Sequence, residues 1–172
     1  LRGKKNVLEV GCADGFNSRI VKQSVKNLVI SDSENKFKEY FNKISNPDWN
    51  IKFILNDFER TKLKKKFDAI YSIDVLEHIT PKKEHKFIKN IIFSLKNSGM
   101  LIIGMPSLEF QKFSRPSKIS GHINCKTEEK LKKFLEKYFD NVIIFSMNDE
   151  LVHTGFEKMS CYFFALCFQK KI

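Results

Sequence analysis

A pair of glycines near the start of the chain is well placed to hold a ligand. Gly11 and Gly15 bracket Cys12, Ala13 and Asp14 in the stretch NVLEVGCADGFN. Glycine permits positive φ values and lets a ligand approach bare backbone. When such a turn opens a helix, its main-chain N–H groups lack helical partners and can bind a ligand. The turn therefore predicts a ligand cradle, with a ligand-free turn between strand and helix as the alternative.

Acidic residues follow the next two apolar runs. Asp32 follows the run 27–30, and Asp57 follows the run 51–55. In nucleoside-binding α/β folds, an acid at the end of the second strand accepts hydrogen bonds from the ribose hydroxyls. We therefore expect Asp32 to face a ligand while Ser33 caps the next helix. The alternative is that these residues only cap that helix.

Histidines are the side chains best suited to move protons near neutral pH. His78 lies in the run DVLEHI, and His122 and His153 lie in two irregular polar stretches, 107–124 and 147–159. Each is a candidate catalytic base, and a structural hydrogen bond is the alternative for each. The residues expected to contact a substrate are Glu77, His122, Asn124, Asp149, Glu150 and His153.

Alternating strands and helices would position these residues. Apolar runs predict strands, and helical spacing of apolar residues predicts helices. The last two strands follow one another without a helix, which predicts an antiparallel final hairpin. Gly99 is expected to cap the third helix at its C-terminus. The expected strands are 7–10, 27–30, 51–55, 67–74, 100–105, 141–146 and 162–169, and the expected helices are 16–25, 34–44, 82–95 and 127–138.

Length and composition favour one α/β domain over residues 1–172. The 172 residues can bury a sizeable core, and the chain is 42% hydrophobic and 30% charged. No apolar run approaches the length of a membrane span. The chain begins with Leu1 rather than Met, so we expect its N-terminus to be trimmed. The 4 cysteines lack zinc-type spacing and are expected as free thiols in the cytoplasm.

The net charge of +11 raises the question of a nucleic-acid partner. Lysine supplies almost all of this charge, and the lysines are spread over predicted helices and turns. Arginine, which forks onto phosphate more effectively, is scarce. We therefore expect a solvated surface rather than a nucleic-acid face.

The glycine turn and the DVLEHI run resemble those of a known family. Glu9 precedes Gly11 by two residues, so the turn is similar to the E/D-x-G-x-G-x-G signature of class I S-adenosylmethionine (SAM)-dependent methyltransferases, with Ala13 replacing the middle glycine. The run FDAIYSIDVLEHI resembles motif IV of members that methylate small molecules, including the ubiquinone-pathway O-methylating type. The dinucleotide pattern G-x-G-x-x-G fits less well, which disfavours a nicotinamide oxidoreductase. The run matches neither the N-P-P-Y nor the Pro-Cys motif of DNA methyltransferases.

The resemblance implies a fold and a cofactor. The fold would be a three-layer α/β/α sandwich whose seven-stranded, mostly parallel sheet has an antiparallel last strand. The cofactor would be SAM, with S-adenosylhomocysteine (SAH) as product. In the family, the acid matching Asp57 contacts the adenine amino group and the residue matching Phe58 packs on the ring. The residues expected to bind the cofactor are Glu9, Gly11, Cys12, Ala13, Asp14, Gly15, Asp32, Ser33, Asp57, Phe58, Asp74, Leu76 and His78.

The expected activity is methyl transfer to an oxygen or nitrogen of a small polar acceptor, with a sugar or a cell-surface polysaccharide precursor as one candidate. The alternatives are an RNA methyltransferase and a SAM-binding module without turnover. No metal is expected, because Glu77, Asp149, Glu150 and His153 show no ordered ligand spacing.

Overall fold

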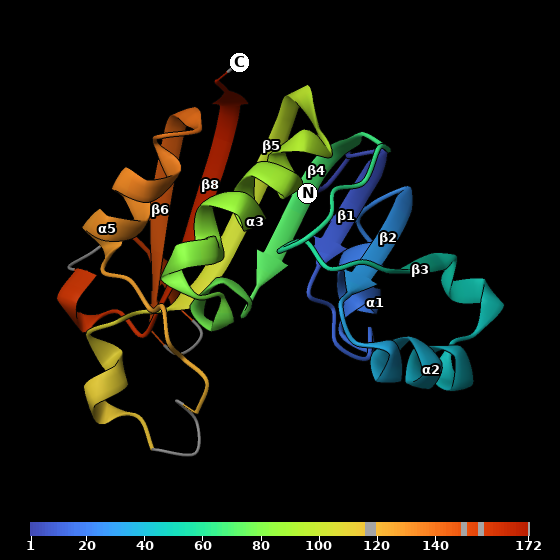
Figure 1. The fold of residues 1–172 in the computed structure, drawn as a ribbon, viewed down its shortest axis with the longest axis horizontal. Helices are drawn as coiled ribbons and strands as arrows, with labels where there is room; N and C mark the ends of the chain where they lie inside the picture. Colours follow the sequence, from blue (N-terminus) through green and yellow to red (C-terminus); the bar gives the residue numbers. More distant parts are fainter. Residues whose placement is uncertain (116–119, 149–150, 155–156, 172) are drawn as a thin grey trace.

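Buried apolar runs form the strands of one sheet. The computed structural model describes residues 1–115, 120–148, 151–154 and 157–171 (Figure 1). Within these residues the sheet has 8 strands in the order β3-β2-β1-β4-β5-β8-β6-β7. The strands are β1 (Asn6–Val10), β2 (Asn27–Asp32), β3 (Ile51–Leu55), β4 (Phe67–Ile73), β5 (Leu95–Pro106), β6 (Phe139–Asn148), β7 (Leu151–His153) and β8 (Tyr162–Lys170).

The directions of the strands match the prediction. Strands β1 to β5 pair in parallel, and β8 lies antiparallel between β5 and β6. The predicted mostly parallel sheet with an antiparallel last strand is therefore confirmed. The short strand β7 pairs with β6 inside a stretch that was expected to be irregular, and it adds an eighth strand at the sheet edge.

Helices cover both faces of the sheet and complete three layers. Helices α3 (Pro81–Phe93) and α5 (Glu128–Leu135) lie on the near face in Figure 1. Their buried side chains join the larger apolar cluster. The segment with α1 (Ser18–Lys22) and helix α2 (Asn35–Ile44) contributes to a second cluster. None of the described helices is long and apolar enough to cross a membrane.

Two predicted helix boundaries are wrong. Helix α1 spans 5 residues, and Phe16 and Ile20, which were expected on its buried face, are exposed. Helix α3 ends at Phe93, so Gly99 does not cap it and lies within β5. The helix ends early because Leu95 belongs to the sheet, where it pairs with Phe67. In this position the side chain of Leu95 is fully buried in the core.

The parallel strands β1 to β4 all end at one edge of the sheet, and the arrowheads of β1 and β4 point to it in Figure 1. In open α/β sheets, ligands bind in the crevice outside the carboxyl ends of the strands. The predicted cradle, Asp32 and Asp57 follow three of these ends. The fold therefore brings them to the same edge.

Replacing Gly15 by alanine should destabilise the fold more than the same change at Gly3. Both glycines have left-handed backbone, with φ of 71° at Gly15 and 81° at Gly3. A Cβ at Gly15 would lie 2.6 Å from Ile30 Cδ1 and 2.8 Å from Phe41 Cδ2, whereas nothing lies within 4 Å at Gly3. We expect a loss of about 1 kcal/mol for Gly3→Ala from backbone strain, and about 2–4 kcal/mol for Gly15→Ala from strain plus overpacking. Urea unfolding of both variants measures the difference, and equal losses would contradict the packing role of Gly15.

Candidate functional site

A pocket of about 480 Å³ opens at this edge of the sheet. It combines the glycine turn after β1 with the segments that follow β2, β3 and β4. The lining residues that the sequence predicted are Gly11, Ala13, Asp32, Ser33, Asp57, Phe58, Asp74 and His78. The lining residues that it did not predict are Val10, Glu34, Phe37, Asn56, Glu59, Val75, Ile79 and Phe87.

The glycine turn is held tightly against the strands beside it. The N–H groups of Gly11 and Cys12 both donate to the carbonyl of Ser31, at 2.8 and 3.0 Å. A Cβ at Gly11, where φ is 79°, would lie 2.2 Å from Cγ2 of Val75. Ala13 also has left-handed backbone, with φ of 47°, a conformation that costs an L-residue roughly 1 kcal/mol. The turn is therefore a strained, fixed element rather than an adaptable loop.

Asp32 joins the glycine turn to the start of α2. Its Oδ2 accepts a hydrogen bond from Ala13 N and its Oδ1 accepts one from Glu34 N, both at 3.0 Å. The cap position of α2 is Glu34, and no side chain caps it, so the prediction that Ser33 caps this helix is wrong. Instead, the carboxylate of Asp32 accepts the hydrogen bond from the Glu34 N–H at the start of α2. Ser33 lines the pocket.

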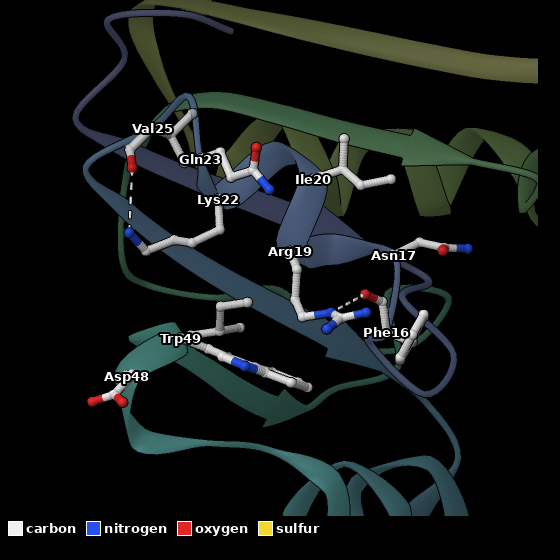
Figure 2. A pocket seen from close by; sticks show the side chains of 10 residues that line it. Phe16, Asn17, Arg19, Ile20, Lys22, Gln23, Val25, Asp48 and Trp49 are labelled. Carbon is white, nitrogen blue, oxygen red and sulfur yellow. Dashed lines mark hydrogen bonds between the residues drawn. The ribbon is translucent and has the colours of Figure 1, made fainter.

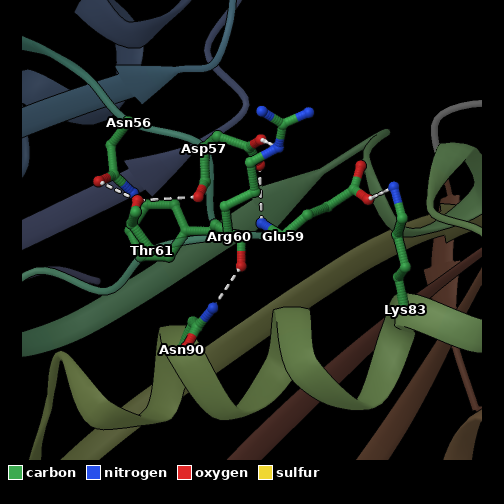
Figure 3. A network of polar contacts seen from close by, with 8 residues as sticks. Asn56, Asp57, Glu59, Arg60, Thr61, Lys83 and Asn90 are labelled. Atoms are coloured by element: carbon green, nitrogen blue, oxygen red, sulfur yellow. Dashed lines mark hydrogen bonds and ion pairs between the residues drawn. The ribbon is translucent and has the colours of Figure 1, made fainter.

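The turn after β3 holds Asp57 in a fixed orientation (Figure 3). Asp57 Oδ1 accepts a hydrogen bond from Glu59 N at 2.8 Å, and its Oδ2 forms an ion pair with Arg60 Nε at 3.1 Å. Phe58 is only 3% exposed. Its carbonyl accepts a hydrogen bond from Asn90 Nδ2 of α3 at 2.8 Å. The segment is therefore anchored to α3, and it presents both predicted residues to the pocket.

Asp74 closes the pocket beside the glycine turn. Its backbone is left-handed, with φ of 55°, and such strain often marks functional positions. Its Oδ1 accepts a hydrogen bond from the hydroxyl of Tyr162 at 2.8 Å. Burial and the nearby Asp74 raise the pKa of Tyr162 above its usual value, so this phenol is a permanent donor. Tyr162 comes from β8, and no local pattern in the sequence could have linked it to Asp74.

The pocket is acidic although the chain is basic. Carboxylates dominate its charged lining, and no lysine or arginine belongs to that lining among the described residues. Such a concave acidic surface attracts a ligand that carries positive charge. The acidic lining residues are Asp32, Glu34, Asp57, Glu59 and Asp74.

A cluster of Glu77, His78 and His122 lies at the end of the pocket where His78 belongs to the lining. His78 Nδ1 lies 2.9 Å from Gly121 O, and His122 Nδ1 lies 3.0 Å from Gln111 Oε1. The two rings meet edge to face with centroids 5.1 Å apart. Burial, with a smaller effect of His78, lowers the pKa of His122 below its usual value. The structure thus brings together two histidines that lie far apart in the sequence.

Glu77 is fully buried, and neither of its carboxylate oxygens has a hydrogen-bond partner among the described residues. Burial raises its pKa to about 7; the charge of Asp74 adds to this, while the dipole of its own main-chain N–H opposes it. A buried carboxylate without a partner is costly, so it indicates a functional position.

Several predicted cofactor residues do not belong to the described lining of the pocket: Glu9, Cys12, Asp14, Gly15 and Leu76. Glu9 Oε2 accepts hydrogen bonds from Ser18 Oγ and Tyr71 Oη, and burial raises its pKa. Burial also raises the pKa of the Cys12 thiol. Glu9 and Cys12 therefore support the turn rather than line the pocket.

The predicted substrate residue Asn124 is instead part of a buried structural cluster. Its Nδ2 donates to Glu84 Oε2 at 2.7 Å, and its Oδ1 accepts from Lys126 Nζ at 3.0 Å. Asn124 is 7% exposed and does not belong to the described pocket lining, so the structure does not support it as a substrate ligand. Asp149 and Glu150 lie outside the described residues, and only the backbone of His153, in β7, is described.

A second, larger pocket of about 710 Å³ lies beside α1 (Figure 2). The guanidinium of Arg19 lies 3.8 Å from the ring centroid of Phe16 and 4.7 Å from that of Trp49. None of the predicted site residues belongs to this pocket. The smaller pocket is the better candidate, because the predicted residues of separate strands meet there.

Comparison with known proteins identifies the family of the chain. The family described as "Methyltransferase domain" matches residues 8–103. No curated protein matches the chain.

Solved structures share the fold at low sequence identity. The methyltransferase domain of bacterial CtHen1 has 17% identity and a TM-score of 0.76, with 96% of this chain and 89% of that chain covered. A DhpI-SAM-HEP complex has 10% identity and a TM-score of 0.69, with 95% and 78% covered. N-methyltransferase NodS from Bradyrhizobium japonicum WM9, in complex with SAH, has 18% identity and a TM-score of 0.67, with 96% and 78% covered.

Removing the lysine that neutralises Glu84 should destabilise the segment after His122. The Lys126–Glu84 pair is 2.7 Å long, and each side chain is 11% exposed. Lys126→Met leaves Glu84 buried and unpaired, so we expect a loss of about 3 kcal/mol in the free energy of unfolding. Lys133→Met breaks the exposed Lys133–Glu129 pair and is the matched control, for which we expect no measurable change. Equal effects in urea unfolding would contradict a structural role for the buried pair.

Proposed function

Because this chain belongs to the methyltransferase domain family and is a class I SAM-dependent methyltransferase, we propose that it methylates an oxygen or nitrogen of a small polar acceptor at the pocket beside Gly11. The observation that carries this proposal is the convergence of the glycine turn and the acids after β2, β3 and β4 in one pocket. SAM carries a positive sulfonium and a positive amino group. The acidic lining favours such a ligand.

The cofactor would lie across the ends of the parallel strands. The glycine turn would hold its methionine end, Asp32 would accept hydrogen bonds from the ribose hydroxyls, and Asp57 with Phe58 would bind the adenine. Binding requires the carboxylate of Asp32 to exchange or share its present bond with Ala13 N, which is exposed at this surface. Half-buried Glu9 and buried Cys12 would support the turn without contacting the cofactor.

The transfer itself needs alignment more than an activated electrophile, because the sulfonium already activates the methyl group. Bound SAM would supply the methyl group: a lone pair of the acceptor would form the new bond to the methyl carbon as the carbon–sulfur bond breaks and its electron pair returns to sulfur. This produces SAH and a methylated acceptor, which then releases its proton to water. The acceptor would enter from the side of His78 and His122, where the described lining of the pocket ends.

A sugar or a polysaccharide precursor is a suitable acceptor class, because its hydroxyls can donate to carboxylates without bringing negative charge. RNA is the weaker candidate despite the charge of +11, because Asp32 and Asp74, the lining carboxylates without an ion pair among the described residues, would repel its phosphates. Cytoplasmic location stays a prediction, as does a role for His153 as base.

Titration calorimetry with SAH tests the assignment of the pocket. We expect micromolar binding to the intact protein. Asp32→Asn removes the charge that the ribose hydroxyls need, so we expect affinity to fall at least about 10-fold. Asp48→Asn is the matched control, because Asp48 belongs to the second pocket, and we expect it to bind normally. A loss of SAH binding in Asp48→Asn but not in Asp32→Asn would place the cofactor in the second pocket and overturn the proposed placement.

Methyl transfer from labelled SAM tests the acceptor class. Incorporation into sugars or sugar-containing metabolites would support a small polar acceptor. Incorporation into RNA, with an affinity that falls steeply as salt rises, would replace it. SAH binding without transfer to any acceptor would favour a binding module.

A further inference from the structure

Three side chains beside the pocket could hold a metal ion. One ligand atom each of Glu77, His78 and His122 can be chosen so that all lie within 4.8 Å of one another. Around a tetrahedral Zn²⁺, with ligand distances of about 2.1 Å, ligand atoms lie roughly 3.4 Å apart. Side-chain adjustments on the order of 1 Å would therefore close the cluster around one ion.

The hydrogen bonds of the two histidines leave the same nitrogen free on each ring. The acceptor of His78 Nδ1 is the carbonyl of Gly121, and the acceptor of His122 Nδ1 is the amide oxygen of Gln111. A carbonyl oxygen cannot donate, so each Nδ1 carries the proton and each Nε2 of a neutral ring keeps its lone pair. Metal-binding histidines show this pattern, in which one nitrogen donates to a carbonyl and the other binds the ion.

Glu77 supplies an independent observation. Its side chain is fully buried beside the histidines, and both oxygens lack a hydrogen-bond partner. None of the ion pairs between described residues includes it. Buried charges in proteins are paired or bind metals, so a cation bound here would stabilise the ionised form of this carboxylate.

The segment that carries His122 is fixed to Glu77. The carbonyl of Glu77 accepts hydrogen bonds from Ile123 N and Asn124 N, both at 2.9 Å. At Gly121, where φ is 85°, a Cβ would lie 3.2 Å from His78 Nδ1. The close approach of this glycine and the bonds to Glu77 hold the three ligands in place before an ion arrives.

We propose that Glu77, His78 and His122 form a binding site for one divalent transition-metal ion such as Zn²⁺, Mn²⁺ or Co²⁺. Imidazole and carboxylate together suit these ions, and three protein ligands leave open coordination positions. This differs from the sequence-based expectation of no metal, because the sequence alone does not show that residues 77 and 122 lie close together in space. The sequence offered Glu77, His78 and His122 as separate candidates but could not group them as ligands of one ion, because the whole of α3 and β5 lies between His78 and His122.

The role of the ion rests on the proposed function. A hydroxyl oxygen of the acceptor would take an open position and lose its proton to water more readily, because the metal stabilises the alkoxide. The alkoxide oxygen would then attack the methyl carbon of SAM as its carbon–sulfur bond breaks. The site thus favours a hydroxyl-bearing acceptor over an amine.

Co²⁺ is a suitable probe because its visible absorption reports its ligands. We expect the metal-free protein to bind one equivalent of Co²⁺ with a new visible absorption band. Glu77→Gln, His78→Ala and His122→Ala should each weaken binding at least about 10-fold, and Gln111→Ala should weaken it less, by releasing the ring of His122. His85→Ala is the matched control, since His85 lies on α3 and bonds to Tyr138, and it should bind as the intact protein does.

The outcomes separate the metal site from the proposed function. No saturable Co²⁺ binding, or binding that the three ligand variants leave unchanged, would overturn the metal site. Circular dichroism and SAH calorimetry on the same samples show whether each variant is folded. SAH binding without Co²⁺ binding removes the metal site alone. Co²⁺ binding without SAH binding preserves the metal site and removes the proposed function.

Discussion

The contact between Gly11 and Val75 is the constraint on which the site depends. The glycine turn after β1 and the segment after β4 approach so closely that a single added methyl would lie 2.2 Å from Val75 Cγ2. This contact joins the turn that carries Ala13 to the segment that carries Asp74 and His78, all of which line the pocket. Half-buried Glu9, which accepts hydrogen bonds from Ser18 and Tyr71, anchors the end of β1 just before the turn. The strained backbone at Ala13 and Asp74 is the cost of this close packing.

The charge of the pocket lining is opposite in sign to the net charge of the chain. Lysines give the chain its net charge of +11, yet the pocket lining is acidic. A positively charged surface elsewhere does not determine what the pocket binds, because field lines concentrate within the concave, low-dielectric site. The local carboxylates therefore favour a cationic cofactor and a neutral acceptor. The net charge alone raised the question of nucleic acid, but the scattered lysines favoured a solvated surface, and the acids of the pocket lining add a further argument against nucleic acid.

The strands and much of the pocket could be predicted because their signals are local. The apolar runs marked the strands, and the predicted pocket acids Asp32, Asp57 and Asp74 lie at the ends of these runs or within two residues of them. The errors arose where tertiary packing overrides local spacing: Leu95 leaves its helix to enter the core, and Asn124 serves a buried ion pair rather than a substrate. Pairings across the chain have no local signal, so Tyr162 with Asp74, and His122 with Glu77, required the structure.

A crystal structure of the protein with SAH bound tests the central claim most directly, because it shows both the pocket and the contacts. The account predicts the ribose hydroxyls at Asp32, the adenine beside Asp57 and Phe58, and the sulfur facing the Glu77, His78 and His122 cluster. SAH in the pocket between Arg19 and Trp49, or with its ribose away from Asp32, would contradict it.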